Sequence, residues 1–193
     1  MSKFETRTFD CKVESDESNK IVGYGSVFDK RSVDLGGFRE IIAPGAFDGR
    51  LEDDCRALFN HNPDFVLGRT TAGTLALSTD DNGLRYDIDP PETSWAQDLM
   101  VSMRRGDISQ SSFGFRVGDD DWIYDEESDT VIRTVNRVEI LRDVSVVTYP
   151  AYEASDSSVR SMNALLEARN DGDMSKIVSH RSYRERFLKL LNS

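Results

Sequence analysis

The sequence predicts a mainly β chain with flanking helices, an α+β class. Over about the first 150 residues, short runs of β-branched and aromatic side chains are separated by turn-forming residues, the pattern of short strands. Asn82-Gly83 lies between two alternating runs, T-L-A-L-S-T and L-R-Y-D-I-D, and this dipeptide favours a hairpin turn whose central residues both need positive φ. Many short strands with few helices predict an antiparallel barrel, or a strongly bent sheet, flanked by helices.

The first predicted elements are strands over 3–14 and 21–28, with a polar stretch between them. Pro44 is placed to begin a short helix, because proline is favoured in a first helical turn. Residues 55–59 are predicted to form a strand that ends in the loop Asn-His-Asn-Pro, residues 60–63. Functional side chains often project from such a strand-to-loop junction.

A helix is predicted after the Pro-Pro pair that ends the second strand of the hairpin. Thr93 or Ser94 can cap its N-terminus, and Gly106 can end it. Apolar side chains spaced four residues apart form one face of this helix: Trp95, Leu99 and Met103.

The sheet is predicted to continue with a strand over 108–117 and a hairpin across 126–129. A long strand through Ile140 and a second one to Tyr149 follow. Residues 156–168 have helical spacing of apolar side chains. The strands are therefore expected to lie N-terminal to this helix.

The chain is predicted to divide into a main domain over 1–168 and an appendage over 169–193, made of a linker and a basic amphipathic helix. Residues 176–193 hold five Lys or Arg side chains and one Glu, a net charge of +4. The formal net charge of the whole chain is −11, so the rest carries −15. The basic segment is expected either to have its own partner or to dock on the acidic body.

The net charge argues against nucleic acid and anionic membrane as partners, because both need a cationic surface. The N-terminus lacks the apolar region of a signal peptide, and no apolar run reaches membrane-spanning length, so a chain that is not secreted is expected. Cys11 and Cys55 are predicted to be buried free thiols. Neither has partners at metal-site spacing, and no metal or other cofactor is expected.

Residues 108–117, I-S-Q-S-S-F-G-F-R-V, pose a choice between serines. Strand side chains alternate faces, so Ser109 and Ser111 fall on the apolar face with the two phenylalanines. Ser112 is out of phase and shares its face with Gly114, which would let a peptide backbone approach. Ser112 is therefore predicted to be the accessible hydroxyl.

A nucleophilic serine needs a base, and the base needs a third group to orient it. His61 lies in the loop after a predicted strand, whereas His180 lies in the basic tail and is expected to be solvated. In the strand V-E-I-L-R-D-V-S-V-V, alternation places Glu139, Leu141, Asp143 and Ser145 on one face. This face therefore offers two acids, Glu139 and Asp143. A surface histidine and a solvated strand face would explain the same residues, so the pattern alone leaves both interpretations open.

The order and the residues of five motifs resemble those of one family, the prohead (capsid maturation) proteases of tailed bacteriophages. These proteases are distant relatives of the herpesvirus assemblins. The resemblance runs from about residue 23 to about residue 154 and covers short motifs in this order: I-I-A-P-G-A-F, the histidine loop with L-G-R-T, L-x-L-x-x-D-D-N-G-L, R-R-G-D-I-S-Q-S-S-F-G-F, and L-R-D-V-S-V-V-T-Y-P-A.

The resemblance implies roles for individual residues. The serine directly before F-G-F, Ser112, would be the nucleophile, and the histidine before L-G-R-T, His61, would be the base. Assemblins use a second histidine as third member, but this chain has none in the matching strand. Phage members have an acid there, which makes Asp143 the expected orienter, with Glu139 in reserve. The implied fold is an assemblin-like, mainly antiparallel β-barrel.

The implied activity is that of a serine endopeptidase, with residues 1–168 as the protease domain. It would cleave the phage major capsid protein, its scaffold segment and the chain itself within the assembling prohead, in the host cell cytoplasm, and it would self-associate. The rival hypothesis is a non-catalytic assembly scaffold or chaperone with the same fold. A small-molecule esterase is a third alternative, although nothing in the sequence resembles an apolar acyl pocket. The distance between the Ser112 hydroxyl and the His61 ring separates the first two.

Overall fold

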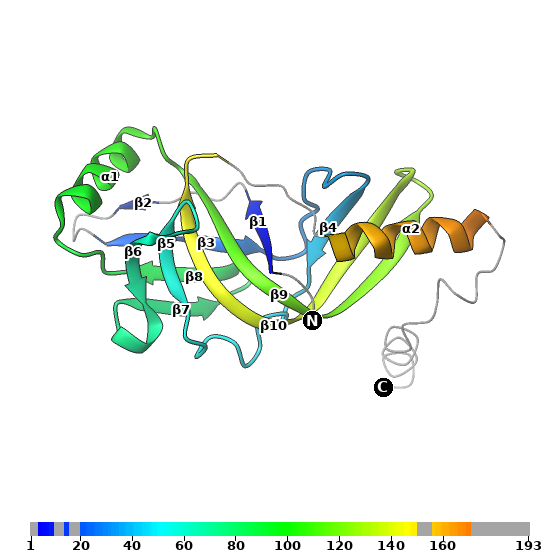
Figure 1. Cartoon of the computed structure of the whole chain (residues 1–193), viewed down its shortest axis with the longest axis horizontal. Helices are drawn as coiled ribbons and strands as arrows, with labels where there is room; N and C mark the ends of the chain where they lie inside the picture. The colour runs from blue at the N-terminus through cyan, green and yellow to red at the C-terminus, as the bar shows by residue number, and fades with distance from the viewer. Residues whose placement is uncertain (1–3, 10–13, 16–19, 150–155, 171–193) are drawn as a thin grey trace.

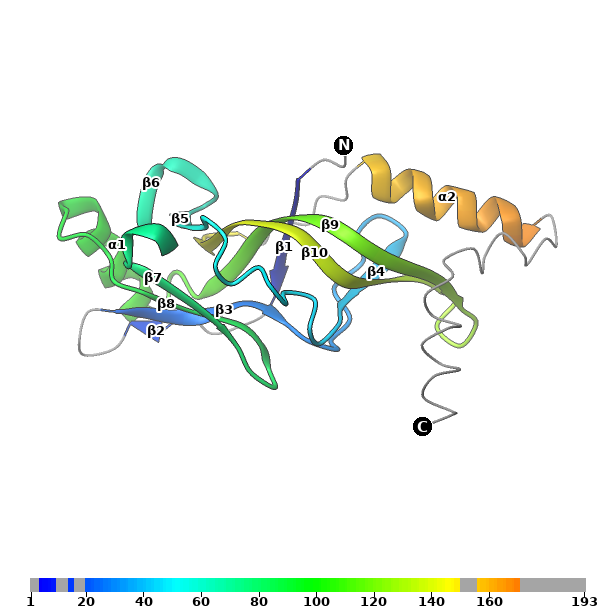
Figure 2. The same cartoon turned by 90° about the horizontal axis from the view of Figure 1, so that it is seen from below.

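The computed structural model describes residues 4–9, 14–15, 20–149 and 156–170. These residues form a mainly β structure with two α-helices, as predicted (Figure 1). The strands pair in two sheets, one above the other in Figure 2. The larger sheet has the order β1-β9-β10-β5-β6, with β4 also on β10, and the smaller has the order β2-β3-β8-β7. The described strands thus form two sheets, and the closed assemblin-like barrel stays a prediction.

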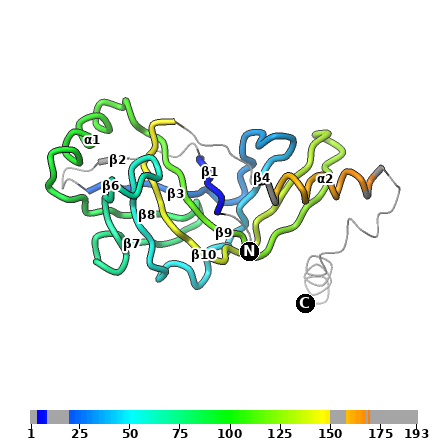
Figure 3. The backbone as a smooth tube through the Cα atoms, in the orientation of Figure 1, coloured from blue at the N-terminus to red at the C-terminus, as the bar shows by residue number. Residues whose placement is uncertain are grey.

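The larger sheet is built on one long hairpin, β9–β10, which curves through the whole molecule (Figure 3). β1 pairs antiparallel with β9, whereas β4 and β5 pair with β10 in parallel, so this sheet is mixed rather than wholly antiparallel. The bounds of its strands are β1 Glu5–Phe9, β4 Phe38–Ile42, β5 Arg56–Phe59, β6 Asn62–Arg69, β9 Gln110–Asp125 and β10 Thr130–Val147. The hairpin predicted across 126–129 is confirmed, but the two strands predicted after it are one continuous strand.

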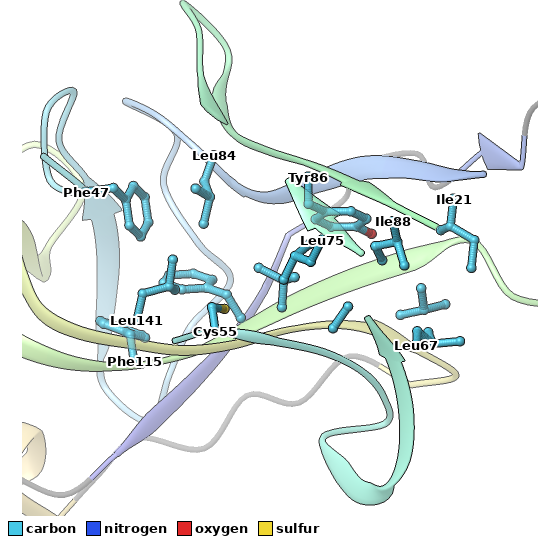
Figure 4. Close-up of a cluster of buried hydrophobic side chains, with 14 of the residues drawn as sticks. Ile21, Phe47, Cys55, Leu67, Leu75, Leu84, Tyr86, Ile88, Phe115 and Leu141 are labelled. Atoms are coloured by element: carbon cyan, nitrogen blue, oxygen red, sulfur yellow. The ribbon is translucent and has the colours of Figure 1, made fainter. Parts of the chain in front are cut away.

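The smaller sheet covers one face of the larger sheet. Its strands are β2 Glu14–Ser15, β3 Ile21–Val27, β7 Leu75–Thr79 and β8 Gly83–Ile88, and a short 3-10 helix, η1 Thr70–Ala72, precedes β7. The main core fills the space between the sheets, where Leu84 and Tyr86 of β8 face Phe115 and Leu141 of the β9–β10 hairpin (Figure 4). The other face of the larger sheet is thereby left to carry polar side chains.

Both described helices were predicted from their apolar spacing. α1, Ser94–Arg105, begins after Thr93 and ends at Gly106, whose left-handed φ of 82° suits glycine. α2, Asp156–Asn170, packs through Met162 and Leu165 on a second cluster that contains Phe38 and Trp122. The linker and amphipathic helix predicted over 169–193 lie outside the described residues, except that residues 169 and 170 form the end of α2.

Two local predictions are wrong for reasons of backbone geometry. The segment after Pro44 forms successive turns instead of a helix, because Gly45 and Gly49 adopt left-handed φ values of 82° and 71°. At the β7–β8 turn, neither Asn82 nor Gly83 has positive φ. A Cβ on Gly83 would lie 2.0 Å from the carbonyl oxygen of Ser26, so glycine is required there by close backbone approach.

Candidate active site

His61 stands at the tip of a two-residue hairpin turn between β5 and β6. Phe59 pairs with Asn62, and the two central residues, Asn60 and His61, have φ values of 54° and 55°. Such turns need positive φ at both positions, which is uncommon for residues other than glycine and is often found at functional sites. The turn is fixed on the end of β10, since Asn60 N–H donates to the Val146 carbonyl at 2.9 Å. The imidazole is thus held by a rigid, strained turn.

Ser112 lies on β9, and the predicted alternation separates it from Ser111. Ser111 faces the smaller sheet, where its hydroxyl is 2.9 Å from the Tyr86 hydroxyl. Ser112 points to the opposite face and pairs in register with Ser145 of β10. Phe113 turns back toward the core and stacks on Phe115 with ring centroids 4.5 Å apart. The F-G-F motif therefore anchors the strand from the core side.

Asp143 reaches the same face because β10 is irregular beside it. The β9–β10 register shifts between Leu141 and Asp143, which is the effect of a bulge. Alternation placed Leu141 on the site face, but it lies in the core. Asp143 pairs with Gly114, and a Cβ on this glycine would lie 2.4 Å from Asp143 Oδ2. Gly114 thus makes room for the carboxylate, not for an approaching peptide as the sequence suggested.

The three side chains form a continuous hydrogen-bonded chain. His61 Nε2 is 2.7 Å from Ser112 Oγ, and His61 Nδ1 is 2.6 Å from Asp143 Oδ1. The Asp143 carboxylate is buried, and the imidazole is 18% exposed. An anionic Asp143 favours the tautomer with the proton on Nδ1, which leaves Nε2 as the acceptor that faces the serine hydroxyl. This geometry suits removal of the serine proton by the imidazole.

Ser145 is a further member of this network that sequence reasoning did not select. Its hydroxyl donates to Asp143 Oδ1 at 2.9 Å and is 3.2 Å from His61 Nδ1. The sequence pattern already put it on one face with Asp143, because strand side chains alternate, but gave it no role in the site. Ser145 holds the carboxylate that faces the imidazole.

The reserve acid, Glu139, lies elsewhere. Its side chain is half exposed, and its carboxylate is 3.9 Å from Arg116 Nε. The carboxylate at His61 is that of Asp143. His180 lies outside the described residues, so its predicted solvation stays a prediction.

The expectation that Ser112 is accessible is wrong for this structure. The residue is completely buried, because β1 pairs along β9 and places Thr8 opposite it. The Ser112 hydroxyl donates to the carbonyl oxygen of Arg7 at 2.8 Å. The sequence predicted a strand that includes β1 but gave no indication that it lies against the serine.

A second polar cluster, called here the ion cluster, is buried on the opposite face of β1 from Ser112. Arg7 Nε lies 2.8 Å from Glu40 on β4, and Arg133 Nη1 on β10 lies 2.7 Å from Glu5. Arg133 also pairs with Glu40 at 3.0 Å and with Asp120 at 2.7 Å. Burial lowers the pKa of the Arg133 guanidinium, but the charges of Glu40 and Glu5 outweigh it and raise that pKa above its ordinary value.

Cys55 lies just before β5 and is buried as a free thiol, as predicted. Burial, and then the negative charge of Asp143, raise the pKa of its thiol to about 12. Cys11 lies outside the described residues. Within the described ranges, no group of three or more His, Cys, Asp or Glu side chains could hold a metal ion. The part of the chain that the structure describes also contains no helix long and apolar enough to cross a membrane.

A Ser–His–Asp arrangement on a mainly β scaffold is typical of serine hydrolases. Residues 3–168 match the family model of the caudovirus prohead serine proteases, and the chain belongs to this family. It is also 32% identical over 158 residues to the prohead protease of Enterobacteria phage HK97. That match covers 77% of this chain and 63% of the phage protein, so this chain spans less than two thirds of its relative's length. No solved structure gives a significant match.

Proposed function

We propose that the chain is a serine endopeptidase in which Ser112 is the nucleophile, His61 the general base and Asp143 the group that orients the base. The observation that supports this most is the continuous chain of contacts from the Asp143 carboxylate through the imidazole to the Ser112 hydroxyl. Membership in the prohead serine protease family supports the same assignment of reaction class.

The proposed reaction is acyl transfer to serine and then to water. Ser112 Oγ bonds to the carbonyl carbon of a substrate peptide, while its proton passes to His61 Nε2. The imidazolium, stabilised by Asp143, gives that proton to the leaving amine as the peptide C–N bond breaks. A water molecule, deprotonated by the same imidazole, then breaks the acyl ester and regenerates the hydroxyl. Backbone N–H groups are expected to bind the oxyanion.

The proposed substrates are the scaffold segment of the major capsid protein and segments of this chain itself. The work would take place inside the assembling prohead, in the cytoplasm of the host, where copies of the chain would associate. The similarity to the prohead protease of phage HK97 supports this setting. A scaffold or chaperone without catalysis is the competing function. The 2.7 Å separation of Ser112 Oγ and His61 Nε2 favours the protease, since a scaffold needs no such contact.

The test is co-expression of the full chain with the major capsid protein of the same phage, followed by intact-mass measurement of both. The parent chain is expected to shorten the capsid protein at defined bonds. The Ser112→Ala variant is expected to cleave at least about 10³-fold more slowly, because the nucleophile is lost. Ser111→Ala is the matched control, since Ser111 bonds Tyr86 on the core side. Equal processing by Ser112→Ala and the parent would overturn the proposal.

A further inference from the structure

The N-terminal strand β1 lies on the nucleophile as an extended peptide would. It pairs antiparallel with β9 from Glu5 opposite Phe115 to Phe9 opposite Ser111. Figure 1 shows β1 beside β9, on the side away from β10. Extended peptides commonly bind proteins in this way, by adding a strand to a sheet edge. The Arg7 carbonyl, which precedes the Arg7–Thr8 peptide bond, is the group at the Ser112 hydroxyl.

This contact interferes with the proposed chemistry. The Ser112 hydroxyl has one proton and two acceptors within reach, His61 Nε2 at 2.7 Å and the Arg7 carbonyl oxygen at 2.8 Å. A hydroxyl donates one hydrogen bond, so a bond to Arg7 competes with proton transfer to the imidazole. The same strand leaves no exposed surface on Ser112. A substrate therefore cannot reach the serine while β1 stays in this register.

The Arg7 side chain is held in a pocket that the rest of the chain builds. Arg7 pairs in register with Phe113, so its side chain points to the opposite face from Ser112. It is 1% exposed, its guanidinium lies 5.7 Å from the centre of the Phe115 ring, and it pairs with Glu40. Arginine is almost never this buried unless it is paired.

The acidic wall of this pocket does not depend on β1. Glu40 is completely buried, its backbone N–H donates to the Ser32 hydroxyl oxygen at 2.8 Å, and its carboxylate accepts from Arg133. Arg133 is in turn fixed by Asp120. If β1 leaves, these groups retain each other, and a negative charge remains for another cation.

We propose that the edge of β9 beside Ser112 is the peptide-binding site of the enzyme and that β1 is its tethered occupant. The site takes an extended peptide with arginine immediately before the bond to be cleaved, and Glu40 receives that arginine. The full chain is therefore latent until β1 is displaced, which a capsid-protein segment that competes for the same edge would do. The inference rests on the proposed function only in calling the bound peptide a substrate.

The test uses full-length chains with the Ser112→Ala substitution, so that no catalysis is needed. The probe is a fluorescein-labelled peptide, F-E-T-R-T-F, with the sequence of residues 4–9, and its binding is followed by fluorescence anisotropy. Arg7→Glu is added to expel β1, since it brings a third carboxylate close to Glu5 and Glu40. We expect this chain to bind the peptide at least tenfold more tightly than the chain with Arg7 intact, whose own strand has a high effective concentration.

Three controls isolate the claim. Arg105→Glu makes the same charge change at an exposed position and should leave binding as weak as in the Arg7 chain. The peptide F-E-T-E-T-F should bind the Arg7→Glu chain at least tenfold more weakly than F-E-T-R-T-F. Glu40→Gln, added to the Arg7→Glu chain, should weaken F-E-T-R-T-F binding to a similar extent. Circular dichroism shows whether each chain folds, and Arg7→Ala replaces Arg7→Glu if the latter does not.

Equal binding of the peptide by chains with and without Arg7 would overturn the inference, because the site would then not be the one that β1 occupies. Failure of a folded Arg7→Glu or Arg7→Ala chain to bind would overturn it as well. Neither result depends on cleavage. An Arg7→Glu chain with Ser112 intact that cuts nothing while the binding pattern holds would refute the proposed protease function and leave the peptide site in place.

Discussion

The two buried polar groups on either face of β9 are built on opposite principles. The Ser112–His61–Asp143 network has one carboxylate, an uncharged hydroxyl and a partly exposed imidazole. The ion cluster consists of charged side chains that are joined by a network of ion pairs, with Glu40 and Arg7 almost fully buried. A proton can pass between the side chains of the Ser112–His61–Asp143 network with small changes in the positions of their atoms. The ion cluster joins charged side chains of β1, β4, β9 and β10 and holds these strands in place.

This difference indicates which substitutions should affect activity and which should affect stability. The network depends on the position and charge of a few atoms and adds little to stability, because its members keep other partners or contact solvent. The ion cluster is sensitive to the loss of any partner, since a buried charge left alone is costly. Variants should therefore divide into those that remove activity from a folded chain and those that unfold it.

The largest expected effect is in the network. Asp143→Asn keeps the shape of the side chain but removes its charge and can favour the wrong imidazole tautomer. We expect kcat to fall by about 10³ to 10⁴-fold, as when the acid of a serine protease triad is neutralised. Activity on the capsid protein and the midpoint of urea unfolding are measured together. A loss below tenfold would remove Asp143 as the orienting group, and a large fall in the midpoint would contradict the contrast between the clusters.

The next effect is in the ion cluster. Arg133→Met removes one of the two cations, Arg133 and Arg7, that Glu40 and Glu5 share, and breaking a buried pair in this way costs about 3–5 kcal/mol. The free energy of unfolding, measured in urea, should fall by that amount. Arg105→Met is the matched control, because its pair with Asp107 is mostly exposed and such pairs contribute about 0–1 kcal/mol. An Arg133→Met chain as stable as this control would show that the cluster does not hold the fold.

The two clusters also differ in how far the sequence could predict them. Alternation along β9 separated Ser112 from Ser111, and the loop signal at 60–63 singled out His61, because both are local properties of a strand or turn. Alternation failed at Leu141, where a bulge shifts the register. Only the resemblance to a family narrowed the acid to Asp143.

The ion cluster could not be predicted, because its members lie far apart in the chain. Arg7 meets Glu40 and comes close to Arg133 only through the pairing of β1 with β9 and of β4 with β10. Nothing in the local sequence indicates which strand will lie on an edge beside another. The burial of Ser112 was missed for the same reason. Long-range pairing, rather than local propensity, decides whether the site is open.

A smaller effect is expected where the network touches the backbone. Gly114→Ala places a methyl group against Asp143 Oδ2, which must then move. Because Ser145 and His61 hold this carboxylate, we expect kcat to fall roughly tenfold or more with little change in stability. Gly118→Ala on the same strand is the control, since its methyl group would meet the flexible end of Arg137 and the backbone nitrogen of Glu139, which lie outside the network. Equal kcat values for the two variants would contradict the tight fit of Asp143.

The smallest effect is expected at Cys55, whose thiol has no proposed role in catalysis but whose pKa depends in part on the charge of Asp143. Its pKa of about 12 means that the thiolate is scarce at pH 8, so iodoacetamide should label it roughly a thousandfold more slowly in the native chain than in urea. A Cys11→Ser background leaves one thiol to follow by mass. The raised pKa stabilises the fold fully below pH 9, the ordinary value, and this contribution is lost as the pH rises toward 12.

Asp143→Asn should speed labelling of Cys55, because the negative charge of Asp143 is the second cause of the raised thiol pKa after burial. Rapid labelling of the folded parent chain would show that the thiol is not enclosed beneath the network, and unchanged labelling in Asp143→Asn would show that the carboxylate's charge does not reach it.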